Sequence, residues 1–344
     1  MEKKDILSLY PQEIEELVIS LDEPKFRAKQ IFTWLYKPVD SFSEMTNLPK
    51  KLIEKLEETC FINRPKIERK LVSKNDGTVK YLFKFYDGEY VESVFMRYKH
   101  GNTVCISTQV GCLMGCSFCA STINGKTRDL APSEMLGQIT EIERDLNEKV
   151  SNVVLMGMGE PLDNYDNVIK FLRLINHHDG RNIGMRHISL STCGLVDKIR
   201  TLMEEDLQIN LSISLHAPND EIRNTLMPVN RKWNMDTLLE VCREYAEKSG
   251  RRIHFEYNVV KGVNDSKENA LELAKRLKGM LCHVNLIPVN PVKGKNYTFP
   301  DKKNIQFFCK LLNNCGICAT IRRTLGEDVD ASCGQLRRRV IENE

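Results

Sequence analysis

Three cysteines in one short segment, Cys112, Cys116 and Cys119, have the type and spacing to hold a metal centre. Three thiolates within eight residues can converge on one ion or cluster. A structural zinc site needs a fourth ligand and is usually built from paired CxxC units, whereas a 4Fe-4S cluster held by three cysteines keeps one iron open. The spacing therefore predicts a 4Fe-4S cluster with an open iron, and zinc or redox-inert thiols are the alternatives.

Two isolated cysteines could act as nucleophiles. Cys333 lies in a polar loop bracketed by Gly326 and Gly334, where small neighbours let a substrate approach. Cys105 lies seven residues before Cys112 in a strand-like run whose polar and apolar residues alternate. A polar face that points into a barrel would aim Cys105 at the active site. A bystander loop thiol and a buried core thiol are the alternatives.

Other residues carry weaker signals. Gly159 and Glu160 follow a short apolar run, and a carboxylate beside glycine-exposed backbone can receive an amino group; a turn with a solvated glutamate is the alternative. A further CxxC lies near the end of the chain, but its apolar surroundings predict core thiols. The CxxC consists of Cys315 and Cys318, and the same prediction applies to the nearby Cys309.

The elements that must position these residues divide the chain into three parts. Helical spacing of apolar residues predicts a helical domain over 1–75, and alternation on both sides of Asp87-Gly88 predicts a β-hairpin linker over 76–98. From 99 to 344, short apolar runs alternate with helical stretches, which is typical of βαβ units and a parallel sheet. The runs lie near 103–108, 152–157, 187–192, 209–215, 253–260 and 283–289.

Six such units are too few for a closed eight-stranded barrel, and no GxGxxG turn opens the first of them. The sequence therefore predicts an α/β fold with a partial (βα)6 barrel. Chemistry in such barrels gathers at the C-terminal ends of the strands.

Composition limits the class of protein. The 344 residues are 41% hydrophobic and 28% charged, which excludes disordered and fibrous chains. No apolar run is long enough to span a membrane and no secretory signal opens the chain, so a cytoplasmic protein without a membrane partner is expected. Its 12 cysteines are then thiols, metal ligands or catalysts.

The cysteine loop after the first strand of a six-unit barrel resembles the radical S-adenosylmethionine enzymes. Further motifs resemble their RNA adenine methyltransferases, the RlmN/Cfr group, and the N-terminal stretch 23–32 is similar to the branch that modifies carbon 2 of adenine. The resembling segments are 107–112, 156–162, 215–220, 261–266, 285–288 and 331–336.

The resemblance implies one 4Fe-4S cluster on the three cysteines and two molecules of S-adenosylmethionine per turnover. It also implies that the cofactor is contacted by residues near the strand ends, which are Gly159, Glu160, Ser191, Ser214, Leu215, His216 and Asn290.

The chemistry of adenine explains the remaining residues. Carbon 2 is electron-poor, so polar methyl transfer is unavailable, but a carbon radical can add there. The resemblance implies that Cys333 carries the methyl group to the base and forms a covalent intermediate with it. Cys105 would release the product by forming a disulfide with Cys333. The resemblance also implies that Glu92 is a proton acceptor or a contact to the base, and which of Cys105 and Glu92 removes the ring proton stays open.

The resemblance also implies the partners: an adenosine of 23S rRNA near the peptidyl transferase centre, the tRNA adenosine beside the anticodon, and a flavodoxin or ferredoxin as electron donor. Basic clusters at 64–70, 322–323 and 337–339 could hold an RNA backbone. Two alternatives stay open. One is a carbon-8 methyltransferase that confers antibiotic resistance, and the other is a non-enzymatic iron–sulfur RNA-binding sensor.

Overall fold

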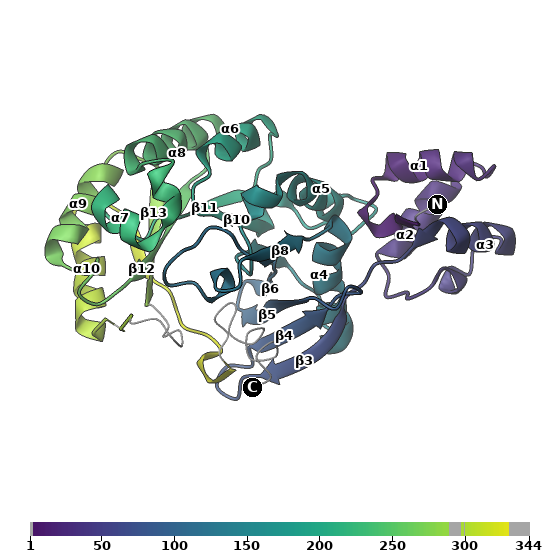
Figure 1. Cartoon of the computed structure of the whole chain (residues 1–344), viewed down its shortest axis with the longest axis horizontal. Helices are drawn as coiled ribbons and strands as arrows, with labels where there is room; N and C mark the ends of the chain where they lie inside the picture. Colours follow the sequence, from purple (N-terminus) through teal and green to yellow (C-terminus); the bar gives the residue numbers. More distant parts are fainter. Residues whose placement is uncertain (1–2, 289–296, 299, 330–344) are drawn as a thin grey trace.

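The structure, a computed structural model, describes residues 3–288, 297, 298 and 300–329. Its main feature is a ten-stranded sheet in the order β14-β13-β12-β11-β10-β9-β6-β5-β4-β3 (Figure 1). Seven of these strands pair in parallel. They are β6 (Gly101–Cys105), β9 (Asn152–Leu155), β10 (Ile188–Thr192), β11 (Asn210–Ser214), β12 (Ile253–Val259), β13 (Cys282–Pro288) and β14 (Ala319–Ile321).

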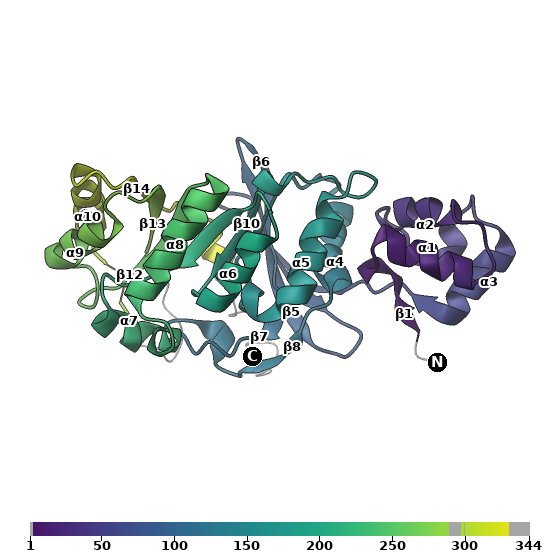
Figure 2. The same cartoon turned by 90° about the horizontal axis from the view of Figure 1, so that it is seen from above.

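Helices connect the parallel strands and cover the outer face of the curved sheet (Figures 1 and 2). The predicted α/β partial barrel is therefore confirmed, and a short seventh strand, β14, extends it. None of the helices in the described ranges is long and apolar enough to cross a membrane. The helices are α4 (Pro132–Leu146), α5 (Tyr165–Asn176), α6 (Val196–Glu204), α7 (Asp220–Leu226), α8 (Met235–Ser249), α9 (Lys267–Leu277) and α10 (Lys302–Asn314).

The segment expected to be a hairpin linker is part of this sheet. β4 (Val79–Lys84) and β5 (Tyr90–Tyr98) form the hairpin, but β5 also pairs with β6, and β3 (Lys66–Val72) pairs with β4 at the edge. β3 thus lies inside the range predicted to be helical. An unpaired edge of β6 would expose backbone donors and acceptors, and the antiparallel strands satisfy them.

Alternation along the strands gives the sheet two unlike faces. Residues that face the helices are apolar and buried, as Val104, Leu190 and Phe255 illustrate. Because directly paired residues point to the same side, the strand register defines the opposite, inner face. That face is polar and includes Lys80, Glu92, Cys105, Ser189, Ser191, Ser212, Ser214, His254, Glu256, His283, Asn285 and Thr320.

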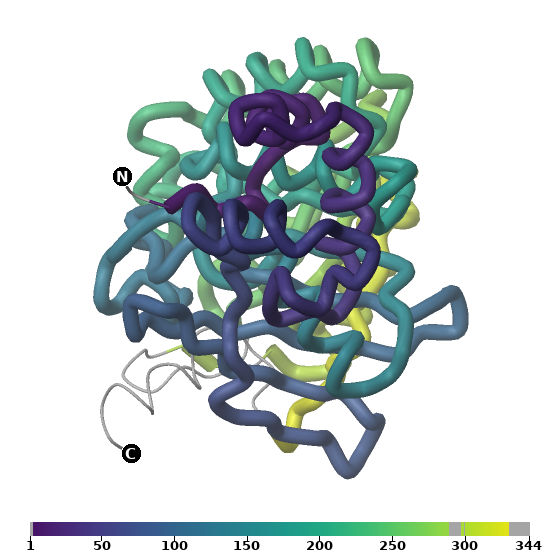
Figure 3. The backbone as a smooth tube through the Cα atoms, turned by 90° about the vertical axis from the view of Figure 1, so that its right-hand side faces the viewer, coloured from purple at the N-terminus to yellow at the C-terminus, as the bar shows by residue number. Residues whose placement is uncertain are grey.

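The N-terminal helices form a separate lobe at one end of the molecule, beside α4 and α5 (Figures 2 and 3). The lobe comprises α1 (Pro11–Ser20), α2 (Arg27–Leu35) and α3 (Lys50–Thr59), with a two-stranded sheet of β1 (Lys4–Asp5) and β2 (Cys60–Phe61). It is tied to α4 through Ser133, which bonds to Asp5, Ser8 and Asn63.

One expected RNA contact takes part in this docking instead. The Arg64 side chain is only 7% exposed and lies 3.5 Å from the Glu141 carboxylate of α4. Arg64 also donates to the Leu35 and Lys37 carbonyls at 3.0 and 2.8 Å. The prediction that Arg64 belongs to a basic RNA-binding surface is therefore wrong, because its guanidinium is used to join the lobe to the barrel.

Candidate active site

The cysteine loop starts directly after β7 (Gln109–Gly111) and returns through β8 (Lys126–Asp129), which pairs with β7. Cys112 and Cys116 are buried, and Cys119 is partly exposed. Gly111 has a φ of +81°, and a Cβ there would lie 1.9 Å from the Gly125 carbonyl oxygen. Only glycine lets the two strands of the loop approach so closely.

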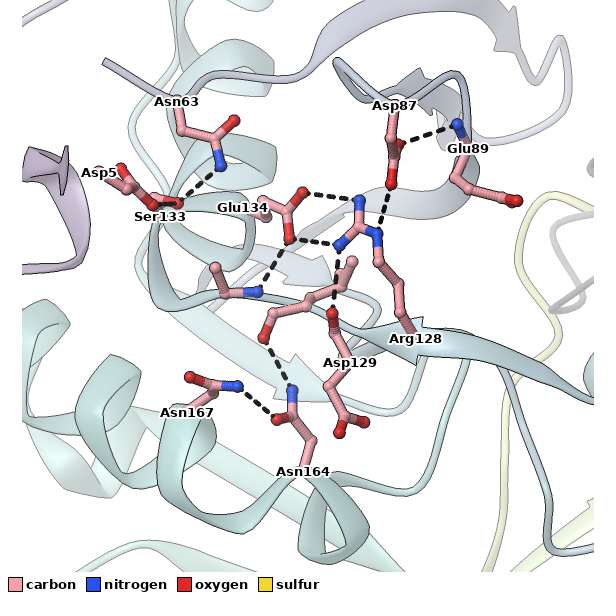
Figure 4. Close-up of polar contacts among 12 residues, drawn as sticks. Asp5, Asn63, Asp87, Glu89, Arg128, Asp129, Ser133, Glu134, Asn164 and Asn167 are labelled. Carbon is pink, nitrogen blue, oxygen red and sulfur yellow. Dashed lines mark hydrogen bonds and ion pairs between the residues drawn. The ribbon is translucent and has the colours of Figure 1, made fainter. Parts of the chain in front are cut away.

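Arg128 of β8 ties the loop to two neighbouring elements (Figure 4). Its Nη1 and Nη2 donate to both carboxylate oxygens of Glu134, at the start of α4, at 2.8 and 2.9 Å. Its Nε donates to Asp87 Oδ2 in the β4–β5 turn at 2.5 Å. A bidentate arginine–carboxylate pair fixes direction as well as distance. The cysteine loop is thus held by side chains from outside it.

The electrostatics of the cysteine loop fit a cationic centre. Burial raises the pKa of the Cys112 thiol to about 12, and the neighbouring Cys119 thiol acts in the same direction. Burial also raises the pKa of Cys116, to which both other cysteines contribute. Conversion of these thiols to thiolates therefore needs a positive partner, which an iron–sulfur cluster would supply.

The spacing of the sulfurs argues against a single zinc ion. Tetrahedral Zn–S bonds of about 2.3 Å would place the sulfurs about 3.8 Å apart. Within the described ranges, one group of three ligand residues has all its ligand atoms within 4.8 Å of one another, and it is His177, His178 and Asp179. At least two of the three loop sulfurs therefore lie more than 4.8 Å apart in this structure.

Glu160 is almost fully buried beside this loop. Its carboxylate accepts the Cys193 N–H at 2.7 Å and the Leu162 N–H at 3.1 Å, while its own N–H donates to Gln109 Oε1 at 2.8 Å. Burial raises its pKa, and these backbone donors act against the increase. A Cβ on Gly159 would lie 2.6 Å from the Gln109 Cβ. The Gly159-Glu160 pair is thereby packed directly against the strand that leads into the cysteine loop.

The other residues expected to contact the cofactor lie at adjacent strand ends. Ser191 and Ser214 face each other with their hydroxyls 3.5 Å apart. The Leu215 carbonyl accepts from the buried Arg223 Nε at 3.2 Å. Asn290 lies outside the described residues.

His216 links the end of β11 to the cysteine loop. Its Nδ1 accepts the Asn258 N–H at 2.9 Å, and its ring meets Phe118 edge-on at 4.9 Å. Burial and the nearby Arg223 guanidinium lower the pKa of His216 to about 3. The imidazole is therefore neutral at physiological pH, and it orients the loop rather than carrying charge.

Cys105 and Glu92 lie on the same inner face of the sheet. Cys105 is directly paired with Val94, two residues along β5 from Glu92. Glu92 Oε2 lies 3.0 Å from Nζ of Lys80, and both of these side chains are buried. Burial raises the pKa of Cys105 to about 11, with Arg322 opposing the shift. The thiol of Cys105 is therefore protonated at neutral pH, whereas Glu92 is held as one half of an ion pair.

The described cysteines differ from two predictions, one about a disulfide and one about core thiols. The eleven cysteines of the described ranges are all free thiols, so a disulfide among them is not supported. Cys333 lies outside these ranges, and its pairing with Cys105 stays a prediction. The expectation of core thiols is wrong for Cys315 and Cys318, which are exposed because the turn after α10 lies at the surface.

Sequence reasoning missed four buried charged residues: Lys80, Glu134, Arg223 and Glu256. Lys80 and Glu256 occupy inward positions of their strands, so strict alternation would have found them. Glu256 accepts from Asn285 Nδ2 at 2.9 Å, and burial raises its pKa. Arg223 left no local signal, because its partners are backbone carbonyls and Asn230.

Comparison with known proteins agrees with this geometry. The family model of the radical SAM superfamily matches residues 106–274, and the model of the ribosomal RNA large subunit methyltransferase N-terminal domain matches residues 4–62. A crystal structure of a radical SAM methyltransferase from Sphaerobacter thermophilus is 41% identical, with a TM-score of 0.92 over 96% of this chain and 98% of that one.

Curated relatives match along the full length. A protein of Clostridium novyi named "Probable dual-specificity RNA methyltransferase RlmN" is 53% identical over 99% of both chains. A protein of Alkaliphilus oremlandii with the same name is 54% identical over 100% of both chains.

The partial barrel and its three-cysteine loop define a radical S-adenosylmethionine enzyme. Within that class, the chain belongs to the RlmN family of RNA methyltransferases. Membership implies a 4Fe-4S cluster and S-adenosylmethionine as its cofactors.

Proposed function

We propose that this protein methylates carbon 2 of adenine in two RNAs, 23S rRNA near the peptidyl transferase centre and tRNA at the adenosine beside the anticodon. The name dual-specificity RNA methyltransferase, carried by relatives over the full chain, supports two RNA targets. The observation that carries the chemistry is that Glu92 and Cys105 share one polar inner face of the sheet.

The cofactors supply the reacting groups, and the residues of the protein bind these cofactors. When bound, the cluster and S-adenosylmethionine supply the methyl group and the radical that activates it. Cys112, Cys116 and Cys119 hold the cluster, and the two strand-end hydroxyls of Ser191 and Ser214 offer polar contacts to S-adenosylmethionine. Gly159, Glu160, Leu215, His216 and Asn290 complete the predicted cofactor site. Electrons come from a flavodoxin or ferredoxin, and two molecules of S-adenosylmethionine are used per turnover.

Cys333 holds the methyl group as a thioether, and the activated carbon adds to carbon 2 of the base. The ring proton must then leave, and the bond between carbon and the Cys333 sulfur must break. We assign the ring proton to Glu92 rather than to Cys105, because the Glu92 carboxylate lies on the same inner face beside the Lys80 ammonium, whereas burial raises the pKa of the Cys105 thiol to about 11. Release by Cys105 would break the bond between carbon and the Cys333 sulfur: the Cys105 thiol would give its proton to the methylene carbon, which becomes the methyl group, while its sulfur forms a disulfide with Cys333. The unpaired electron of the adduct would return to the cluster, and a reductant of the flavodoxin or thiol class would restore both thiols before the next turnover.

Replacing Cys105 by alanine tests this sequence of steps. In Cys105→Ala, addition to the base still occurs but release fails, so a covalent protein–RNA adduct should accumulate. Denaturing gels of radiolabelled RNA, incubated anaerobically with S-adenosylmethionine and a reductant, measure the adduct. Normal turnover of Cys105→Ala without an adduct would remove Cys105 from the mechanism.

Cys333→Ala is the matched control, because it should form neither adduct nor product while still binding RNA. The same reactions separate the enzyme from an iron–sulfur sensor. An enzyme forms deoxyadenosine, whereas a sensor with an intact cluster forms none.

A further inference from the structure

The segment after β14 crosses the open side of the partial barrel. β14 is one edge strand of the ten-stranded sheet, and β3 is the other. From β14 the chain runs to the turn between β3 and β4, as the yellow trace shows (Figures 1 and 3). The segment 322–329, here called the strap, therefore joins two edges that no strand pairing closes in the described part of the chain.

The strap is held at its far end by two reciprocal carboxylates. Asp76 of the β3–β4 turn accepts the Gly326 N–H of the strap at 2.9 Å. In return, Asp328 of the strap accepts the Ser73 hydroxyl at 2.7 Å and the Lys74 N–H at 2.9 Å. We call these three hydrogen bonds the clasp. Because each side supplies both an acceptor and a backbone donor, the clasp defines one position of the strap.

The turn that receives the strap is itself well defined. The Ser73 N–H donates to the Thr78 carbonyl at 2.8 Å, and the Ser73 hydroxyl also accepts the N–H groups of Asn75 and Asp76 at 3.2 and 3.3 Å. Gly77 bonds back to the Ser73 carbonyl at 3.2 Å. The strap is thus fastened to a turn with several internal hydrogen bonds.

Both carboxylates of the clasp stay ionised. Burial acts to raise the pKa of Asp76, but hydrogen bonds from the Gly326 and Thr78 backbones lower it to about 2. Hydrogen bonds from Ser73 and the Lys74 backbone lower the pKa of Asp328. The acceptors therefore keep their charge throughout the neutral range, and charge-assisted hydrogen bonds are stronger than neutral ones.

The strap begins at the inner face of the sheet, which carries Cys105 and Glu256. Arg322 continues the pairing of β14, with its N–H donating to the Leu286 carbonyl at 2.8 Å. Its charge acts to lower the pKa of both Cys105 on β6 and Glu256 on β12, strands from opposite halves of the barrel. Cys333 follows Asp328 by five residues, so the clasp is the last described anchor before it.

We propose that Asp76 and Asp328 are positioning residues, which fix the start of the Cys333 loop over the inner face by clasping the strap to the β3–β4 turn. This inference rests on the proposed role of Cys333 as methyl carrier. Five residues span at most about 18 Å, so release of the clasp greatly widens the region that the Cys333 sulfur can reach. A misplacement of about 1 Å can already cost 100-fold in rate.

The test compares Asp328→Ala and Asp76→Asn with Glu327→Gln. Glu327 is an exposed carboxylate of the same short turn, so its variant controls for the loss of one negative charge. The readouts are trypsin cleavage after Arg322 and Arg323, hydrogen exchange of the strap amides, RNA methylation, and deoxyadenosine formation. The last of these reports the cluster and cofactor site, which lie outside the clasp.

The two clasp variants should be cleaved faster in the strap and lose RNA methylation by about 10-fold or more, with deoxyadenosine formation within about twofold of wild type. Glu327→Gln should match wild type throughout. Release of the strap with unchanged methylation would overturn the proposal, and so would unchanged cleavage and exchange.

Failure of the proposed function has a different signature. Wild-type protein would then methylate no RNA, whereas the proteolysis and exchange data would still report the clasp. In that case, the anchoring of the strap would be supported if the strap were cleaved faster in the two clasp variants than in wild type and Glu327→Gln. Equal cleavage in all four proteins would refute the anchoring.

Discussion

Replacing Cys116 by alanine is expected to remove most of the iron from anaerobically purified protein and to abolish cleavage of S-adenosylmethionine. Cys116 is a buried cysteine of the loop, and both Cys112 and Cys119 act to raise the pKa of its thiol. A cluster held by two protein ligands is lost readily, and no other cysteine of the loop can take the vacant place. Iron analysis, the absorbance of the cluster and deoxyadenosine formation measure the effect.

Cys242→Ala is the matched control, since Cys242 is a fully buried thiol on α8 that has no place in the loop. It should keep its iron and its activity. Full iron loading of Cys116→Ala, or stoichiometric zinc in wild-type protein, would contradict the assignment of the cluster.

Replacing Lys80 by methionine is expected to lower the free energy of unfolding by about 3–5 kcal/mol, because it removes the ammonium group that lies 3.0 Å from the buried Glu92 carboxylate. The double variant with Glu92→Gln should recover part of this loss, since it also removes the negative charge that the Lys80 ammonium stabilised. Denaturant titrations followed by circular dichroism measure both effects.

Lys84→Met provides the comparison, because Lys84 is a less buried lysine on the same strand. Its effect should stay within about 0.5 kcal/mol. Strictly additive effects of Lys80→Met and Glu92→Gln would show that the two side chains do not act as a pair.

The sequence predicted the architecture well because alternation and helical spacing are local signals. All six predicted barrel strands occur, and a seventh strand, β14, follows them. The boundary between helical lobe and sheet was harder, since β3 is an edge strand with five of its seven residues exposed, and its periodicity is weak. Its place in the sheet depends on pairing with β4, which is tertiary information.

The candidate site likewise contains some features that local sequence patterns predict and others that they do not. The cysteine loop follows from spacing within eight residues. The Lys80–Glu92 pair and the clasp between Asp76 and Asp328 join residues of different elements, and no local pattern predicts such partners. Exposure of Cys315 and Cys318 was missed for a related reason: their apolar neighbours pack inward while the turn that holds them faces solvent.

The central claim is methylation of adenine at carbon 2, and analysis of the modified nucleoside tests it most directly. Unmodified 23S rRNA and tRNA are incubated anaerobically with the cluster-containing protein, S-adenosylmethionine and a reductant, then digested and separated by chromatography with mass detection. The proposed function predicts 2-methyladenosine from both RNAs and none with Cys333→Ala. Finding 8-methyladenosine as the main product, with unmodified tRNA, would contradict it.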